Sequence, residues 1–196
     1  MLPSSISALP DTLAAAPNGA FTADLFAAHL AALGHLPKWW LDLKREAWNR
    51  FASLPLPQRP NELWRFSTVA GLKLDGYTLP DAADFISQIS DLKSGFAAAF
   101  PHAAALTFAN NRVVPGDALP ADLREKGVIF ESIEAALAGH ADLFRRHFMA
   151  QPVSLGSEKF AALNAALTTS GAFLYVPPDV ELALPLVVTH VVSIRY

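Results

Sequence analysis

The sequence predicts an α+β protein, in which an N-terminal helical region and a small mixed α/β segment lead into the first strands of a β-helix-like core. Three patterns predict this class. Apolar residues recur at helical spacing early in the chain, two apolar runs flank an Asn-Asn pair near its middle, and proline-separated apolar runs follow Gly171. We therefore expect a flexible segment at residues 1–20, a helical and mixed α/β domain at residues 21–170, and the beginning of a β-helix core at residues 171–196.

The composition excludes several classes of function. The chain has 196 residues, 52% of them hydrophobic, which is enough to bury a sizeable core. Charged residues make up 17% and the formal net charge is -3, so no basic field exists to attract nucleic acid or an anionic membrane. The sequence contains no cysteine, which excludes disulfides, thiolate metal sites and thiol nucleophiles within it.

The first twenty residues indicate a cytoplasmic protein. They lack the cationic stretch and continuous apolar run of a secretory signal, and Pro3, Pro10 and Pro17 interrupt them. Elsewhere the apolar stretches are rich in alanine and broken by charges. We therefore expect no transmembrane helix.

Two helices are expected near the start of the chain. The first is capped by Thr22, runs to Leu33 and ends at Gly34. The second begins after Pro37, and its apolar residues recur at intervals of three and four. Its apolar face comprises Trp40, Leu43, Ala47, Trp48 and Phe51, whereas Lys44, Arg45, Asn49 and Arg50 are assigned to the solvent-facing side.

A proline-rich connector follows the second helix. The prolines between Leu54 and Pro60 remove backbone donors and restrict φ, so this stretch is predicted to be extended. Residues 61–66 are predicted to form a short helical turn capped by Asn61.

The middle of the chain is predicted to mix strands and helices. Residues 103–108 and 112–114 are expected to form a β-hairpin, because asparagine tolerates the left-handed angles of a tight turn. Residues 127–130 are expected to join it as a third strand. Short helices are predicted at residues 133–138, 141–149 and 159–167.

Short strands are predicted after Gly171. They lie at residues 172–176, 180–184 and 186–192, with prolines at the intervening corners. A last strand with an unpaired edge normally needs cover. We therefore expect the sequence to be truncated within a larger β architecture.

Trp64, Arg65 and Trp39 are the candidate partner-contact residues. Trp64 and Arg65 fit an exposed cation–π pair that binds a partner, but a tryptophan after a proline-rich connector also fits a structural role at a domain seam. Trp39 points away from the face shared by Trp40 and Trp48, and an exposed tryptophan is suited to seating a partner.

No catalytic, cofactor-binding or metal-binding residue is predicted. The six histidines show neither HxH nor HExxH spacing, and His190 is assigned to a structural role in its strand. The carboxylates are scattered, without a Ser-His-Asp order or a glycine-rich phosphate loop.

Two separated motifs carry a resemblance to a known family. The first comprises Arg45, Ala47, Phe51, Leu54-Pro55-Leu56-Pro57, Glu62, Trp64-Arg65-Phe66 and Thr68. The second comprises Phe160, Leu163-Asn164-Ala165-Ala166, Gly171, Tyr175-Val176-Pro177, Val180, Leu182, Pro185 and His190. Both resemble the SufB/SufD family of iron–sulfur cluster assembly proteins, and the first motif favours the SufD branch. Several motifs in one order are harder to obtain by chance than a single short one.

The resemblance implies a function that the residues alone do not indicate. It implies the N-terminal portion of a non-catalytic scaffold subunit in a complex with SufB and SufC, where SufC hydrolyses ATP and apoproteins receive the cluster. The implied iron–sulfur cluster belongs to the full complex, and none is expected on this portion. The alternatives are a fragment of a β-helix carbohydrate-active enzyme and a stand-alone protein-interaction domain.

Overall fold

The structure is a computed structural model of the chain, and it describes residues 18–57, 64–66, 72, 74, 75, 77, 100–114, 117–149 and 158–192. These residues form six helices and five strands, which confirms the predicted mixture of α and β structure. Their contacts define two compact units. The helical unit comprises the described parts of residues 1–34, 39–77 and 153–167, and the β unit comprises those of residues 35–38, 78–152 and 168–196.

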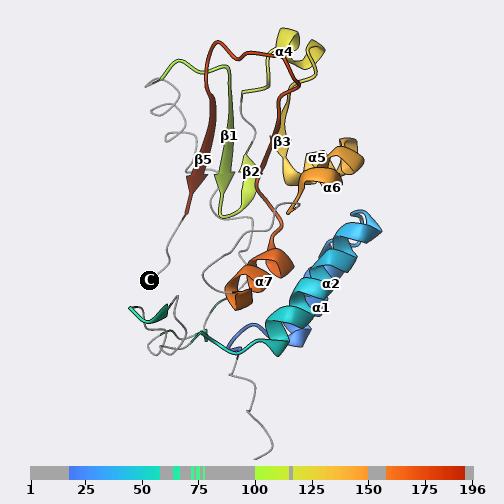
Figure 1. Ribbon diagram of the computed structural model, residues 1–196, viewed down its shortest axis with the longest axis vertical. Helices are drawn as coiled ribbons and strands as arrows, with labels where there is room; N and C mark the ends of the chain where they lie inside the picture. Colours follow the sequence, from blue (N-terminus) through green and yellow to red (C-terminus); the bar gives the residue numbers. More distant parts are fainter. Residues whose placement is uncertain are drawn as a thin grey trace, which may run out of the picture. The chain divides into compact units, whose positions relative to one another are not determined.

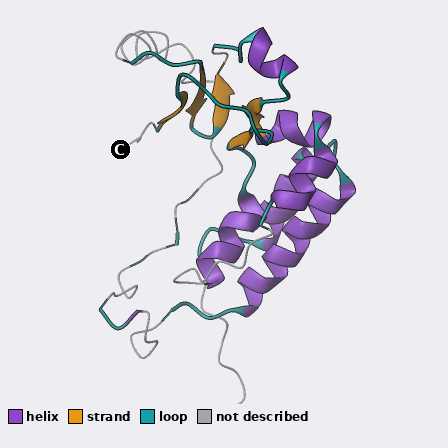
Figure 2. Cartoon of the chain, turned by 45° about the horizontal axis from the view of Figure 1, so that its top comes forward, coloured by secondary structure: helices purple, strands orange, loops and turns teal. Residues whose placement is uncertain are grey.

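Three helices build the helical unit, and they lie side by side in Figures 1 and 2. They are α1 (Ala23–Ala32), α2 (Lys38–Ser53) and α7 (Glu158–Leu167). The predicted cap of α1 is confirmed, because the Thr22 hydroxyl accepts a hydrogen bond of 3.2 Å from the Leu25 amide. This bond satisfies one of the amide groups that every helix leaves open at its start.

Aromatic side chains from α1 and α2 fill the core of the helical unit. Trp48 stacks on Phe26 with ring centroids 4.6 Å apart, and Phe51 is fully buried. Trp40 is only 1% exposed. Aromatic pairs of this kind contribute large apolar areas and a preferred geometry. The predicted apolar face of α2 is thus confirmed at Trp40, Trp48 and Phe51.

The assignment of Lys44 to the solvent-facing side of α2 is wrong. Lys44 is fully buried, and its Nζ atom lies 3.4 Å from the Ala165 carbonyl oxygen and 3.3 Å from that of Ala166. The same nitrogen lies 4.7 Å from the centroid of the Trp40 ring. Both carbonyls belong to the last turn of α7, where a helix has no amide of its own to offer them. The buried ammonium supplies these missing donors.

Lys159 makes the same kind of contact in the opposite direction. It lies at the start of α7 and is 2% exposed, and its Nζ donates to the carbonyl oxygens of Phe51 at 2.8 Å and Leu54 at 2.6 Å. These carbonyls stand at the end of α2. The Lys159 Nζ also lies 4.3 Å from the centroid of the Phe51 ring, which is a cation–π distance.

The two contacts together fasten α2 and α7 as antiparallel neighbours. We call Lys44 and Lys159 the lysine pair. Each helix receives a buried lysine from the other at its C-terminal end, where positive charge is favoured by the helix dipole. Burying an ammonium without such acceptors costs several kcal/mol. That cost is comparable to the whole free energy of unfolding of a small domain. The lysine pair is therefore compatible only with close packing of these two helices.

Burial changes the protonation of the groups around the lysine pair. Loss of water lowers the pKa of Lys44 to about 8 and also lowers the pKa of Lys159. Burial, with the nearby charge of Lys44 as a second cause, lowers the pKa of His29 to about 4, against a raising effect of the Ala166 backbone. The Nε2 atom of His29 is buried without a hydrogen-bond partner among the described residues. An imidazolium at this place would leave that N–H unsatisfied, so His29 is neutral near neutral pH.

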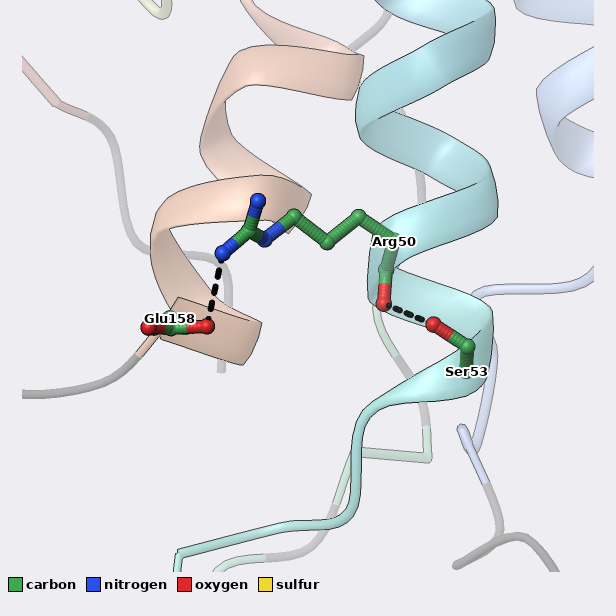
Figure 3. Close-up of polar contacts among 3 residues, drawn as sticks. All are labelled: Arg50, Ser53 and Glu158. Atoms are coloured by element: carbon green, nitrogen blue, oxygen red, sulfur yellow. Dashed lines mark hydrogen bonds and ion pairs between the residues drawn. The ribbon is translucent and has the colours of Figure 1, made fainter.

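Figure 3 shows a surface contact between the same two helices. The Arg50 guanidinium donates to the Glu158 carboxylate at 2.8 Å, and the Ser53 hydroxyl donates to the Arg50 carbonyl at 3.0 Å. The side chains of Arg50 and Glu158 are 62% and 65% exposed. Exposed ion pairs contribute little, typically about 0–1 kcal/mol. The buried lysine pair, and not this salt bridge, dominates the polar contacts between α2 and α7.

The larger sheet of the β unit has the strand order β2-β1-β5. β1 (Ala104–Ala109) and β2 (Arg112–Val114) form the predicted antiparallel hairpin. Its turn residues Asn110 and Asn111 have φ angles of 44° and 67°. These left-handed values are those that the asparagines were expected to tolerate, which confirms the basis of the hairpin prediction.

The strand predicted at residues 127–130 exists, but its predicted place beside the hairpin is wrong. It forms β3 (Ile129–Ser132), which pairs antiparallel with β4 (Ala172–Tyr175) in a second sheet. The free edge of β1 is taken instead by β5 (Leu186–Val191), which runs parallel to it. A parallel pair has no connecting tight turn, so nothing local in the sequence indicates it.

Three short helices belong to the β unit: α4 (Ala121–Glu125), α5 (Ile133–Gly139) and α6 (Ala141–His147). α5 and α6 confirm predicted helices, and α4 was not predicted. The Ser132 hydroxyl caps α5 by accepting from the Ala135 amide at 3.2 Å. None of the six described helices is long and apolar enough to cross a membrane.

The predicted strand at residues 180–184 is wrong. This stretch is irregular between β4 and β5, although Val180 and Leu182 pack against the apolar core of the β unit. An apolar run bounded by prolines fits a loop that buries some of its side chains as well as a strand, since burial does not require sheet pairing. The core residues are Ala104, Leu119, Leu123, Val128 and Phe130.

Replacing Lys159 with methionine should destabilise the helical unit, because the Phe51 and Leu54 carbonyls lose their buried donor while most of the side-chain volume is kept. We expect the free energy of unfolding to fall by about 1–3 kcal/mol. The four tryptophans of the chain lie in the helical unit, so urea unfolding followed by tryptophan fluorescence reports on this unit. The matched control is Arg45→Met, at a side chain on α2 that is 51% exposed. Equal losses in both variants would contradict the capping role.

Mild acid should destabilise the helical unit through His29. The unfolded chain binds the proton near the ordinary histidine pKa of 6.5, whereas folded His29 binds it only near 4. Its contribution is therefore complete above about pH 6.5 and is lost as the pH falls towards 4. Between about pH 7 and about pH 5 we expect a loss of about 2 kcal/mol, measured by tryptophan fluorescence. The variant His29→Gln should show a flatter pH profile, and an unchanged profile would refute this assignment.

Candidate partner-contact site

Trp39 lies in the first turn of α2 and is half-buried. Its ring meets the ring of Trp40 edge to face, with centroids 5.7 Å apart. Because Trp40 is almost completely buried, it forms a rigid base on which Trp39 rests. Part of the Trp39 ring faces solvent from this base, so the residue remains available as a partner contact.

Trp64 and Arg65 are neighbours in sequence but make different contacts. The half-buried ring of Trp64 lies 6.3 Å from that of Phe160 on α7, centroid to centroid. The guanidinium carbon of Arg65 lies 4.5 Å from the centroid of the Phe66 ring. Phe66 itself is 89% exposed. We call the last two residues the Arg65–Phe66 pair.

Trp64 packs next to the lysine pair. Phe160 follows Lys159 directly, and Lys159 attaches the start of α7 to the end of α2. The ring that receives Trp64 is therefore held in place by buried hydrogen bonds. The contact between Trp64 and Phe160 agrees with the structural interpretation of Trp64, and a role in partner binding stays a prediction for all three residues.

Two residues of this region were not predicted from the sequence. Phe66 was part of a motif but not a candidate, although it is the most exposed of the large apolar side chains described. Lys44 was placed on the wrong side of α2. Its position four residues after Trp40 and seven before Phe51 already puts it on the apolar stripe of the helix, which was the available signal.

Among its described residues, the β unit contains three histidine–carboxylate contacts. The Nε2 atoms of His35, His102 and His140 lie 3.4 Å from Glu134, 3.3 Å from Asp117 and 3.7 Å from Glu131. Burial raises the pKa of Glu131, although the charge of His140 opposes this. In the part of the chain that the structure describes, no three histidine, aspartate or glutamate side chains form a group that could hold a metal.

His190 lies on the exposed side of β5. Its ring stacks on that of Phe108, with centroids 4.8 Å apart and planes 11° from parallel. Phe108 is fully buried. This stacking agrees with the structural role assigned to His190.

The geometry therefore offers surfaces for protein contact, in the form of Trp39 on its Trp40 base and the Arg65–Phe66 pair. An exposed aromatic ring together with arginine is typical of residues that dominate protein interfaces. Both surfaces belong to the helical unit.

Comparison with known proteins identifies related chains. The family model described as the SufBD protein N-terminal region matches residues 21–188. The chain is 30% identical over 162 residues to the iron–sulfur cluster assembly protein SufD of Bacillus subtilis (strain 168), an alignment that covers 79% of this chain and 35% of that protein. It is 30% identical over 159 residues to an iron–sulfur cluster assembly SufBD family protein of Staphylococcus epidermidis, covering 76% of this chain and 33% of the relative.

A SufBD family protein of Staphylococcus aureus (strain USA300) is 28% identical over 159 residues, again covering 76% of this chain and 33% of the relative. The chain thus spans about a third of the length of these curated relatives. The family match includes α1, α2, α7, the hairpin and the first half of β5, so it extends over both motifs that suggested the resemblance, except for His190. The chain therefore belongs to the SufBD family and corresponds to its N-terminal region.

Proposed function

We propose that this chain acts in iron–sulfur cluster assembly as a non-catalytic scaffold subunit that associates with SufB and SufC. The observation that carries the proposal is the family match over residues 21–188, together with relatives that are named iron–sulfur cluster assembly proteins. ATP hydrolysis is assigned to SufC and delivery of the cluster to acceptor apoproteins is assigned to the complex.

The chemistry of the chain supports a scaffold role. The sequence has no cysteine, so thiolate ligands for a nascent cluster have to come from outside these 196 residues. The histidine–carboxylate contacts of the β unit are pairs, and an iron–sulfur cluster needs a larger set of soft ligands. We therefore assign to this region the positioning of subunits, and the iron–sulfur cluster to the complete complex.

We further propose that β4 and β5 begin a β-helix core. The parallel pairing of β5 with β1 over six residue pairs supports this, because stacked parallel strands are the repeating contact of a β-helix. Within the described sheet, β5 is an edge strand. Val188 on this strand is 42% exposed, and Val192 directly after it is 72% exposed. The occupants that we assign to this edge are further strands of the same polypeptide, since the relatives are about three times as long as the matched region.

The alternative of a carbohydrate-active β-helix enzyme has less support. Such enzymes need acidic and basic side chains clustered along one sheet. β4 and β5 carry none except the histidine at position 190, whose ring stacks on Phe108. A stand-alone interaction domain would use the same exposed aromatic surfaces as the scaffold, and the two differ in the partner that they bind.

The scaffold function predicts that the tagged chain co-purifies with SufB and SufC of the same organism after co-expression. We also expect the purified complex to acquire the visible absorbance of an iron–sulfur cluster on anaerobic reconstitution with iron and sulfide. Failure to capture either subunit would refute the scaffold proposal. Capture of the subunits without any gain of cluster would leave the chain a binding protein and refute its role in assembly.

The Arg65–Phe66 pair should contribute to this association. The double substitution Arg65→Ala and Phe66→Ala removes an exposed cation–π pair without touching the buried core, so the fold should persist. We expect at least a roughly tenfold weaker capture of SufB or SufC, which corresponds to about 1.4 kcal/mol. The matched control replaces Arg112 and Val113, an exposed arginine and apolar residue on β2, with alanine. Equal capture by both double variants would exclude the pair as a contact.

A further inference from the structure

His102 has an acceptor oxygen against each of its two ring nitrogens. The Nδ1 atom lies 2.8 Å from the Phe100 carbonyl oxygen, and the Nε2 atom lies 3.3 Å from an Asp117 carboxylate oxygen. The imidazole is largely enclosed, with 12% of the side chain exposed, whereas the side chain of Asp117 is 66% exposed. Both distances are within hydrogen-bonding range.

The number of protons on the His102 ring decides how many of these two hydrogen bonds can form. A neutral imidazole carries one N–H, and its other nitrogen can only accept. A backbone carbonyl and an ionised carboxylate can also only accept. Both bonds therefore form together only when the ring carries two protons as an imidazolium. In the neutral ring, one nitrogen lone pair faces an oxygen and that contact is repulsive. The side chain of Asp117 is 66% exposed and can turn to water, whereas the Phe100 acceptor is a backbone carbonyl, so we assign the single proton to Nδ1 and the lost contact to Asp117.

The two partners of His102 stand at the base of the β1–β2 hairpin. His102 comes just before β1, the central strand, and the next amide, that of Ala103, donates to the Pro185 carbonyl just before β5 at 2.9 Å. Asp117 follows β2 and precedes Leu119, a member of the buried core. A link between His102 and Asp117 therefore joins the entry to the hairpin with its exit.

We propose that His102 is a proton-dependent latch that holds the entry and exit of the β1–β2 hairpin together when its ring is an imidazolium and releases Asp117 when the ring is neutral. The latch goes beyond the scaffold function proposed above and does not depend on it. It provides the β unit with a response to pH that involves no change in covalent structure.

The pKa of His102 is shifted in the direction that the latch requires. The hydrogen bond to the Phe100 carbonyl, the bond to Asp117 and the charge of Asp117 all raise the pKa of His102, and burial opposes them. Of the residues that the structure describes, Asp117 is the titratable group that faces the ring, and Phe100 contributes a neutral carbonyl. Because the folded pKa is raised, the contribution of the latch is complete below the ordinary value of 6.5. It is lost as the pH rises through the folded pKa.

The test is an NMR titration of the histidine rings in the whole chain, compared with the variant Asp117→Asn. Asparagine keeps the side-chain size, and its amide can donate to Nε2, so a neutral His102 then satisfies both contacts. We expect His102 to titrate above 6.5 in the native chain and at a lower pH in the variant. The control is Asp142→Asn on α6, which should leave the His102 titration unchanged.

A second readout separates a latch from a simple shift in protonation. In the native chain, the amide signals from Asp117 to Leu119 should move with the midpoint of the His102 titration, and their hydrogen exchange should quicken at higher pH beyond the intrinsic increase. Both effects should disappear in Asp117→Asn. A His102 midpoint at or below 6.5, an equal midpoint in the variant, or amide signals that ignore the titration would each overturn the proposal. No partner protein is used, so the result is independent of the scaffold function.

Discussion

The reciprocal capping of α2 and α7 by Lys44 and Lys159 is the contact on which the helical unit depends. Each lysine is buried and donates to carbonyls at the end of the other helix. The arrangement gives each buried ammonium its acceptors and gives the carbonyls at each helix end a donor. Burial of either lysine would cost free energy if the other helix were not in place. Helices that lie far apart in the sequence are thereby assembled as one unit, with the aromatic core of Phe26, Trp48 and Phe51 beside the junction.

The same contact links the fold to the candidate partner surface. Phe160 is positioned by the neighbouring Lys159 and receives Trp64, and the Arg65–Phe66 pair follows Trp64 directly. A rigid base beneath exposed aromatic residues lowers the entropy that binding has to overcome. This combination agrees with the scaffold role proposed above.

The local patterns of the sequence predicted the structure correctly where interactions within one segment determine it. The Thr22 cap, the helix containing Trp40 and Trp48, and the Asn110–Asn111 turn all formed where they were expected. Predictions failed where contacts with a distant segment determine the pairing of a strand or the burial of a side chain. β3 pairs with β4, and the open edge of β1 is taken by β5, which lies far along the chain. Lys44 enters the core because α7 brings carbonyls to it.

For the candidate site, the sequence identified Trp39, Trp64 and Arg65 as residue types suited to contacts, but exposure depends on packing. It could not show that Trp64 rests against Phe160 or that Phe66 stands in solvent. By itself, the sequence determined the α+β class, most helix positions, the hairpin, the family resemblance and the lack of thiol chemistry, because caps, periodicity, turn residues and composition act locally. Only the tertiary structure decided the partners of β3, β4 and β5, the burial of the lysine pair and the approach of Asp117 to His102. Each of these depends on groups that are distant in sequence and meet only after folding.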